Sequence, residues 1–348
     1  MEIYILIMFL ALFVAWVGKN KAIYWGFFLV LMVISTFREI DVGGDTEYYQ
    51  WAFEDTEAVR GVTIKSFEYG YLFLNFAVSH FTDSYTVFLG VVSFLILFPV
   101  FFVTPIFSKK YNIVIAFYVL LYNFNFSLCF VRQYIAISIL YVGFLLCSST
   151  HKKIYLLITV VLASLFHQTS IFLLLLLPFV NLKYHRIFIS ILIVLSYFIG
   201  RLNIVISFFS QLGIESLYSQ SLTGEMVFSM NGLIMTFYFA FIAYVSKEDS
   251  FLLYTMAIGL VVLNMFVFNT NISRLNWSLS IVQVFVLGNL KMISFFQKKE
   301  TLCRFFSYTY AITLYIMFLS ANQGKVVPYE FIPNIEMIIK NNIGLYFS

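Results

Sequence analysis

The sequence predicts an all-α, polytopic integral membrane protein with about 12 transmembrane helices. Hydrophobic residues make up 61% of the 348 residues, and charged residues only 11%. Apolar runs recur from Ile3 to Ser320, and each approaches the roughly 20 residues that cross a bilayer as a helix. Lipid offers the backbone no hydrogen-bond partner, so these runs must form helices. Their continuous apolar character excludes a transmembrane β-barrel, whose strands alternate polar and apolar residues.

Polar and charged residues divide the apolar runs and set the bounds of the expected spans. The spans cover residues 3–18, 22–37, 85–107, 112–130, 131–148, 154–168, 169–182, 187–207, 228–245, 250–269, 276–296 and 303–320. Residues 67–81 are apolar but short, which predicts a helix that lies on or dips into the outer face without crossing. The short runs 154–168 and 169–182 predict either two spans or one bent, re-entrant unit.

Residues 1–348 are expected to form a single transmembrane domain. Within it, residues 38–84 should form an outer catalytic loop and surface helix, and residues 321–348 an outer tail. The first apolar run has no basic region before it and no small-residue cleavage site after it, so it predicts a retained span.

The basic residues give the orientation, because short cytoplasmic connections of membrane proteins are rich in Lys and Arg. The connections that carry them contain Lys19, Lys21, Lys109, Lys110, Lys152, Lys153, Lys183, Arg186, Lys247 and the stretch 291–304. Placing these connections inside puts both termini outside. It also puts the acidic segment 38–71 outside, where it carries eight of the 17 acidic residues.

Several protein classes are excluded by missing signals. The chain has no GxxxxGK[ST] phosphate loop and no GxGxxG fingerprint, which excludes those routes to ATP hydrolysis and dinucleotide binding. Its three cysteines show no CxxC spacing and lie in or beside apolar runs, which indicates small hydrophobic residues. No cofactor, no metal site built on His or Cys, and no nucleic-acid partner are expected.

The acidic segment contains the first candidate site, DVGGDTEYY, which begins at Asp41. Asp45 could cap a helix that starts after the glycine pair, with Tyr48 and Tyr49 on its surface. Alternatively, Asp45 could act as a base on a substrate hydroxyl or help to hold a metal. Further along the segment, Glu68 could favour the N-terminus of the next helix, bind sugar hydroxyls, or pair with Arg38.

Two further candidates lie at the outer ends of predicted spans. Arg132, followed by Gln133, lies inside an apolar run, where a charge is costly unless it is paired or functional. Its planar guanidinium suits a diphosphate, and a structural pair with an outer-loop acid is the alternative. His167 could be a hydrogen-bonded core histidine or a group that contacts substrate and transfers a proton.

A polar cluster that contains Arg274 joins two spans on the outer side. It could be an ordinary loop or a second phosphate contact, and Arg201 is a weaker candidate of the same kind. Outer-face arginines beside an acidic loop suit pyrophosphate chemistry, because arginine stabilises the departing charge while a carboxylate handles a hydroxyl proton.

In their order and spacing, these segments resemble the EpsG family of multi-pass proteins from bacterial exopolysaccharide and O-antigen gene clusters. The resemblance covers about residues 35–330 and is carried by Arg38, Gly44-Asp45-Thr46, Tyr48-Tyr49, Phe67-Glu68-Tyr69-Gly70-Tyr71, Arg132-Gln133, Phe166-His167-Gln168-Thr169-Ser170, Asn271-Ile272-Ser273-Arg274 and Val327-Pro328-Tyr329. The segment around Asp45 also looks like the acidic first outer loop of C-type glycosyltransferases. Gln168 departs from the family pattern, where serine is more often expected.

The resemblance implies a Wzy-type polysaccharide polymerase in the bacterial inner membrane. Such an enzyme transfers a glycan from undecaprenyl diphosphate to a sugar hydroxyl of another lipid-linked repeat unit at the outer face. Its expected partners are that lipid-linked oligosaccharide, membrane lipid and a chain-length regulator protein. We predict catalytic roles for Asp45, Glu68 and His167, and substrate-binding roles for Arg38, Asp41, Tyr48, Tyr49, Arg132, Gln133 and Arg274.

Two other functions remain open from the sequence. A flippase or solute transporter would place polar residues at mid-membrane in repeated, broken helices, whereas this chain keeps its charges at one face. A glycan acyltransferase would use His167 as its base and would leave the acidic loop without a role.

Overall fold

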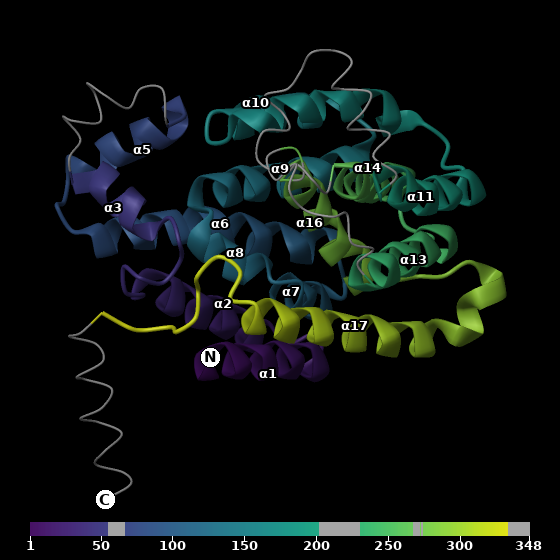
Figure 1. Ribbon diagram of the computed structural model, residues 1–348, viewed down its shortest axis with the longest axis horizontal. Helices are drawn as coiled ribbons and strands as arrows, with labels where there is room; N and C mark the ends of the chain where they lie inside the picture. Colours follow the sequence, from purple (N-terminus) through teal and green to yellow (C-terminus); the bar gives the residue numbers. More distant parts are fainter. Residues whose placement is uncertain (55–66, 202–229, 267–271, 273, 333–348) are drawn as a thin grey trace, which may run out of the picture. The chain divides into compact units, whose positions relative to one another are not determined.

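The computed structural model describes residues 1–54, 67–201, 230–266, 272 and 274–332 (Figure 1). Within these ranges the chain is helical, and its only β-type pairings are isolated bridges. The chain divides into two compact units. The first contains residues 1–142, 159–171 and 305–348, and the second contains residues 143–158 and 172–304.

The first unit is built on three helices near the start of the chain. They are α1 (Glu2–Val17), α2 (Lys21–Thr36) and α6 (Tyr85–Phe107). Asn20 accepts a hydrogen bond from the Ile23 N–H and begins α2, and Ser84 caps α6 in the same way through the Val87 N–H. Helix α2 packs on α6 through aromatic contacts, and Phe28 and Phe101 lie 5.3 Å apart between ring centroids.

A broken helix completes the core of this unit. Helices α7 (Tyr111–Leu120) and α8 (Asn123–Cys129) meet at a 53° bend. Between them Tyr122 has a left-handed backbone, with φ of 50°. The predicted span 112–130 is therefore two helices, because a non-glycine residue takes a conformation that an α-helix does not continue through.

Two short helices follow the acidic loop. Helix α3 (Thr46–Glu54) packs against α5 (Tyr69–Ser79), and both contact α6. At 11 residues, α5 is about 16 Å long, half of a hydrocarbon core, and so agrees with the short helix expected over 67–81.

A C-terminal segment, residues 322–332, lies along the loop that follows α2. Backbone hydrogen bonds run from the Glu39 N–H to the Glu330 carbonyl and from the Gly43 N–H to the Lys325 carbonyl. Gly43 has a φ of 98°, and a Cβ there would lie 2.6 Å from the Leu128 carbonyl oxygen. Only glycine fits this crossing point.

In the described part of the second unit, four helices pack together: α11 (Arg186–Arg201), α13 (Met230–Val245), α14 (Ser250–Met265) and α16 (Leu275–Gly288). Asn264 is buried among them and donates hydrogen bonds to the Ile193 carbonyl and the Ser196 hydroxyl. The predicted span 276–296 is wrong at its end. Helix α16 stops at Gly288, because residues 291–293 turn to pair with residues 245–247 before the short 3₁₀ helix η3 (Ser294–Lys299).

The remaining helices each contribute residues to both units. They are α9 (Val131–Thr150), α10 (Lys153–Ser164), η1 (Gln168–Asn181) and α17 (Glu300–Ser320). The 14-residue η1 is a 3₁₀ helix, whose rise of about 2 Å per residue makes it roughly 28 Å long, near the thickness of a hydrocarbon core.

The structure confirms a helical protein with membrane-spanning character, and the total of twelve spans stays a prediction. Among the described residues, three helices meet the length and hydropathy of a full span, and the bent pair makes a fourth. The full-length helices are residues 85–107, 131–150 and 294–320. Shorter apolar helices account for most other expected spans. Parts of the expected spans 187–207, 228–245 and 250–269, and most of the tail 321–348, lie outside the described residues.

Candidate active site

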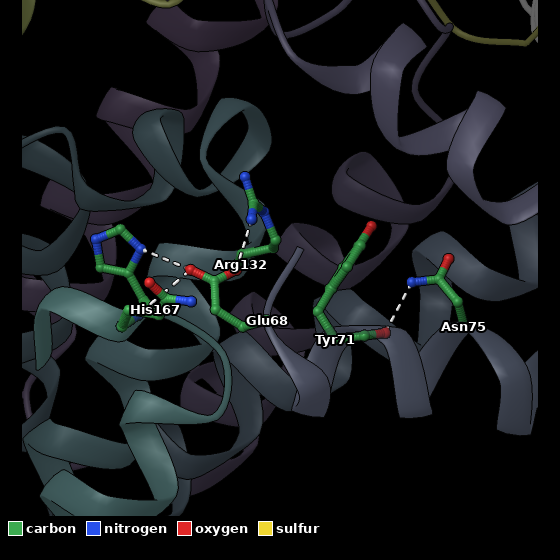
Figure 2. Close-up of polar contacts among 6 residues, drawn as sticks. Glu68, Tyr71, Asn75, Arg132 and His167 are labelled. Atoms are coloured by element: carbon green, nitrogen blue, oxygen red, sulfur yellow. Dashed lines mark hydrogen bonds and ion pairs between the residues drawn. The ribbon is translucent and has the colours of Figure 1, made fainter. Parts of the chain in front are cut away.

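Three side chains that are far apart in the sequence meet in the first unit (Figure 2). Arg132 Nη1 lies 2.5 Å from Glu68 Oε2, and His167 Nδ1 lies 3.6 Å from Glu68 Oε1. The three side chains are largely buried, with Glu68 only 10% exposed. We call Glu68, Arg132 and His167 the charged cluster.

A close backbone approach brings the cluster together. The Gly70 N–H, in the first turn of α5, donates a 2.8 Å hydrogen bond to the Leu165 carbonyl just beyond α10. A Cβ on residue 70 would lie 2.7 Å from the Leu165 oxygen, so this approach requires glycine. The approach places Glu68 beside the turn that carries His167, and the Gln168 N–H donates to Glu68 Oε1 at 3.3 Å.

Aromatic rings surround the Arg132 guanidinium. Its carbon lies 4.8 Å from the ring centroid of Phe67, 5.8 Å from that of Tyr49 and 6.0 Å from that of Tyr71. These distances are in the range of cation–π attraction. Burial raises the pKa of Tyr49 to about 12, against the opposing charge of Arg132, so this phenol stays protonated at neutral pH and is not a base.

The electrostatics of the cluster keep Glu68 ionised. Burial alone would raise the pKa of Glu68, because it disfavours the charged carboxylate. The interaction with His167, the charge of Arg132 and the backbone N–H of Gln168 together outweigh burial and lower the pKa below its ordinary value of 4.5. The carboxylate is therefore charged at neutral pH and acts as an acceptor.

The cluster has the arrangement of a carboxylate-oriented imidazole. Glu68 can hold a proton on His167 Nδ1, which leaves Nε2 with a lone pair that can accept a proton. Nε2 is buried, and within the described part of the chain no hydrogen-bond partner satisfies it. The chemistry this arrangement supports is proton abstraction from a hydroxyl or amine that reaches Nε2.

The alternatives for Glu68 and Arg132 can now be compared with the contacts. Glu68 pairs with Arg132, as one reading of Arg132 predicted, and not with Arg38. Arg38 is only 2% exposed and donates to the carbonyls of Ser35, at 2.5 Å, and Leu128, at 3.2 Å. The structure brings Glu68, Arg132 and His167 together, and their roles in substrate binding and catalysis stay predictions.

The acidic loop has the predicted layout of a loop followed by a helix. Asp45 is half-buried directly before α3, and its carbonyl accepts from the Tyr49 N–H. The Thr46 hydroxyl, at the start of α3, donates back to the Val42 carbonyl at 2.7 Å. Asp41 is exposed.

The other predicted binding residues lie in different settings. Tyr48 stacks on Phe67 with 4.9 Å between ring centroids, so it extends the group of aromatic rings around Arg132. Gln133 is buried at the start of α9. Arg274 belongs to the second unit, where it directly precedes α16 and lies 5.8 Å from the Trp277 ring centroid.

Sequence reasoning missed the residues that shape the cluster. Gly70 and the aromatic residues Phe67 and Tyr71 carry no charge, and the sequence alone assigns them no role. The sequence signal that could have indicated them is their spacing around Glu68. A glycine two residues after the acid permits close contact with another backbone. No group of three or more His, Cys, Asp or Glu that could hold a metal occurs in the described ranges.

Comparison with known proteins agrees with the resemblance. No curated protein and no solved structure shows a significant match. The sequence model of the EpsG family matches residues 21–331, which include α2 through α17, the acidic loop and the charged cluster. The match covers most of the 348 residues, so the chain belongs to the EpsG family.

Proposed function

We propose that this protein is a polysaccharide polymerase of the bacterial inner membrane. Membership of the EpsG family supports a polymerase-like membrane protein, and the charged cluster is the observation that carries the enzymatic part of the proposal. The substrate is a glycan on undecaprenyl diphosphate, and the acceptor is a sugar hydroxyl of a second lipid-linked repeat unit. This reaction forms one glycosidic bond and releases undecaprenyl diphosphate.

In this proposal His167 Nε2 takes the proton from the acceptor hydroxyl as its oxygen attacks the anomeric carbon. Glu68 orients the imidazole through Nδ1, and Arg132 keeps Glu68 ionised. A base of this kind typically contributes ~10²–10⁴-fold to the rate. Asp45 is the competing base, because it lies half-buried before α3 in the same unit.

The departing diphosphate needs cations. Arg132 of the charged cluster is the predicted contact, because a planar guanidinium forms paired hydrogen bonds with phosphate oxygens. Orientation with the cluster at the outer face follows from the basic connections and belongs to the same proposal.

Deletion of the gene tests the function. The deleted strain should make glycans that carry one repeat unit or none, while synthesis of the lipid-linked unit continues, and gel analysis of surface glycan length measures this. Restoring the gene with His167→Gln should not restore long chains. The matched control is His80→Gln, since His80 is exposed at the end of α5, and it should restore them fully. Long chains in the clean deletion would refute the proposal.

Acyl transfer to a glycan is the second candidate, and it is favoured by the buried Nε2 of His167, which has no hydrogen-bond partner among the described residues. That reaction would consume an acyl donor and would leave glycan length unchanged. Loss of glycan acylation with normal chain length in the deletion would select it.

A further inference from the structure

A polar cavity lies in the first unit, and none of its lining residues belongs to the charged cluster. It has a volume of about 400 Å³, within the usual range for small-molecule sites. Its walls come from the loop after α2, from α3, from the start of α6 and from Ile332. The hydrogen-bonding side chains in these walls are Arg38, Glu39, Gln50, Glu54, Tyr85 and Thr86.

Arg38 is the deepest charge in the cavity wall. Its side chain is 2% exposed, and both of its guanidinium contacts are to backbone carbonyls, so neither contact supplies a negative charge. Arg38 Nε is buried, and no partner for it occurs in the part of the chain that the structure describes. Burial lowers the pKa of Arg38, which indicates that its charge is poorly compensated. An oxygen acceptor bound in the cavity would reduce this cost by placing partial negative charge beside Arg38.

Other lining residues supply acceptors. Gln50 donates a 2.6 Å hydrogen bond to Glu54, one turn later on α3, which fixes a carboxylate at the cavity. The Tyr85 hydroxyl donates to the Thr46 carbonyl at 3.2 Å, and its oxygen can still accept. Leu89 and Ile332 add an apolar surface. A wall with donors, acceptors and an apolar patch complements a sugar ring, which has hydroxyls at its edge and C–H groups on its face.

The charge balance of the cavity disfavours a phosphate. Its lining has two carboxylates, Glu39 and Glu54, against one guanidinium, Arg38. Like charges repel in a partly desolvated site, so a diphosphate would meet a net negative wall. The charged cluster differs, because there a guanidinium faces one carboxylate and one imidazole.

We infer that this cavity is a binding site for one neutral sugar residue of the glycan substrate, with its hydroxyls held between Arg38 and Glu54. The inference rests on the proposed function for the source of the sugar. Helix α3 contributes to both the cavity and the surroundings of the charged cluster, because Tyr49 lies beside Arg132 while Gln50 and Glu54 line the cavity. A sugar bound there would be held at a fixed position relative to the charged cluster within the same unit.

Saturation-transfer NMR on the purified protein in nanodiscs tests the site. The probes are glucose, galactose, rhamnose, N-acetylglucosamine and N-acetylgalactosamine, with inorganic pyrophosphate as the anionic probe. Thr86→Trp should fill the cavity, and Val87→Trp is the matched control because Val87 is on the same turn with its side chain 49% exposed. Gln50→Ala removes the hydrogen bond that fixes Glu54.

At least one sugar should give a saturable signal with the wild-type protein and with Val87→Trp. Thr86→Trp should abolish this signal, and Gln50→Ala should weaken the affinity at least tenfold. No saturable signal from any sugar, or an unchanged signal in Thr86→Trp, would overturn the inference. Pyrophosphate binding that Thr86→Trp removes would also overturn it, because the cavity would then be an anion site.

A displacement experiment separates this inference from the proposed function. Lipid extract from the deleted strain should displace the bound sugar, whereas extract from a strain unable to make the lipid-linked repeat should not. One further outcome is a sugar whose binding is abolished by Thr86→Trp but which neither extract displaces. The cavity then binds free sugar, and its assignment to the glycan substrate is wrong. Chain length in the deleted strain then decides the polymerase proposal by itself.

Discussion

Replacing Gly70 by alanine should separate the two backbones that assemble the charged cluster. The new Cβ would lie 2.7 Å from the Leu165 oxygen and 2.9 Å from the Leu165 Cβ, whereas ordinary contacts begin at 3.4 Å. The helix must therefore move by about 0.7 Å, since a backbone carbonyl cannot rotate away as a flexible side chain can. The 2.8 Å hydrogen bond from residue 70 to Leu165 and the 3.6 Å contact between His167 and Glu68 would both lengthen.

Two free energies compete in this variant. Overpacking costs about 1–3 kcal/mol, and alanine recovers at most about 1 kcal/mol over glycine in a helix. With about 1 kcal/mol recovered, the net expectation is a loss of up to about 2 kcal/mol, or a fall in Tm of up to roughly 3 °C for a chain of 348 residues. Thermal unfolding in detergent measures the loss of stability, and glycan length in the complemented deletion strain measures the loss of polymerisation.

Gly26→Ala is the matched control. Gly26 lies inside α2, and a Cβ there meets nothing within 4 Å, so alanine should be neutral or should stabilise the protein by up to about 1 kcal/mol. Long glycans should persist in this control and be lost or shortened in Gly70→Ala. Equal stability of the two variants, with long glycans in both, would refute the account of how the cluster is assembled.

Arg132→Lys should reduce polymerisation nearly as much as Arg132→Ala with the fold retained, because a point charge cannot replace a planar fork; long glycans from the lysine variant would indicate simple charge balance. Asp45→Asn should preserve a helix cap and remove a base, so normal polymerisation in this variant would leave His167 as the base. Glu68 has a lowered pKa, so its contribution to stability is complete above pH 4.5 and is lost as the pH falls through the folded-state pKa. Glu68→Gln should flatten the decline of Tm below that pH, and an unchanged pH profile would contradict the pKa assignment. In a variant without native cysteines, Lys110→Cys should react only with reagents added from the cytoplasmic side, and labelling from outside would show that the helix expected over 67–81 crosses the membrane and that the topology of the first third is inverted.

The helical fold could be predicted because the backbone of a continuous apolar run in lipid must form its hydrogen bonds within the run, as a helix does. The expected span 85–107 coincides with α6, since Ser84 gives a clear start and Ser108 a clear end. The break between α7 and α8 could not be predicted, because Tyr122 adopts its left-handed backbone without the glycine or proline that would signal a turn.

The members of the charged cluster were visible in the sequence, and an outer-loop acid was one predicted partner of Arg132, but the sequence did not show which acid this would be. Isolated charges in apolar surroundings stand out, which marked Glu68, Arg132 and His167. Glu68 and Arg132 are 64 positions apart, and their pairing depends on how α5 packs near residue 165. The local sequence does not predict that packing. The same reason hid the sugar cavity, whose walls come from residues 38–54, 85–89 and 332.

The docking of residues 322–332 along the loop after α2 has a consequence for biogenesis. Glu39 and Gly43 receive their backbone partners from Glu330 and Lys325, which the ribosome adds nearly three hundred residues later. The cavity wall at Ile332 is completed at the same late moment. A chain released before residue 324 would thus insert most of its helices yet display an unfinished acidic loop, so membrane proteases could recognise the truncated product by that loop.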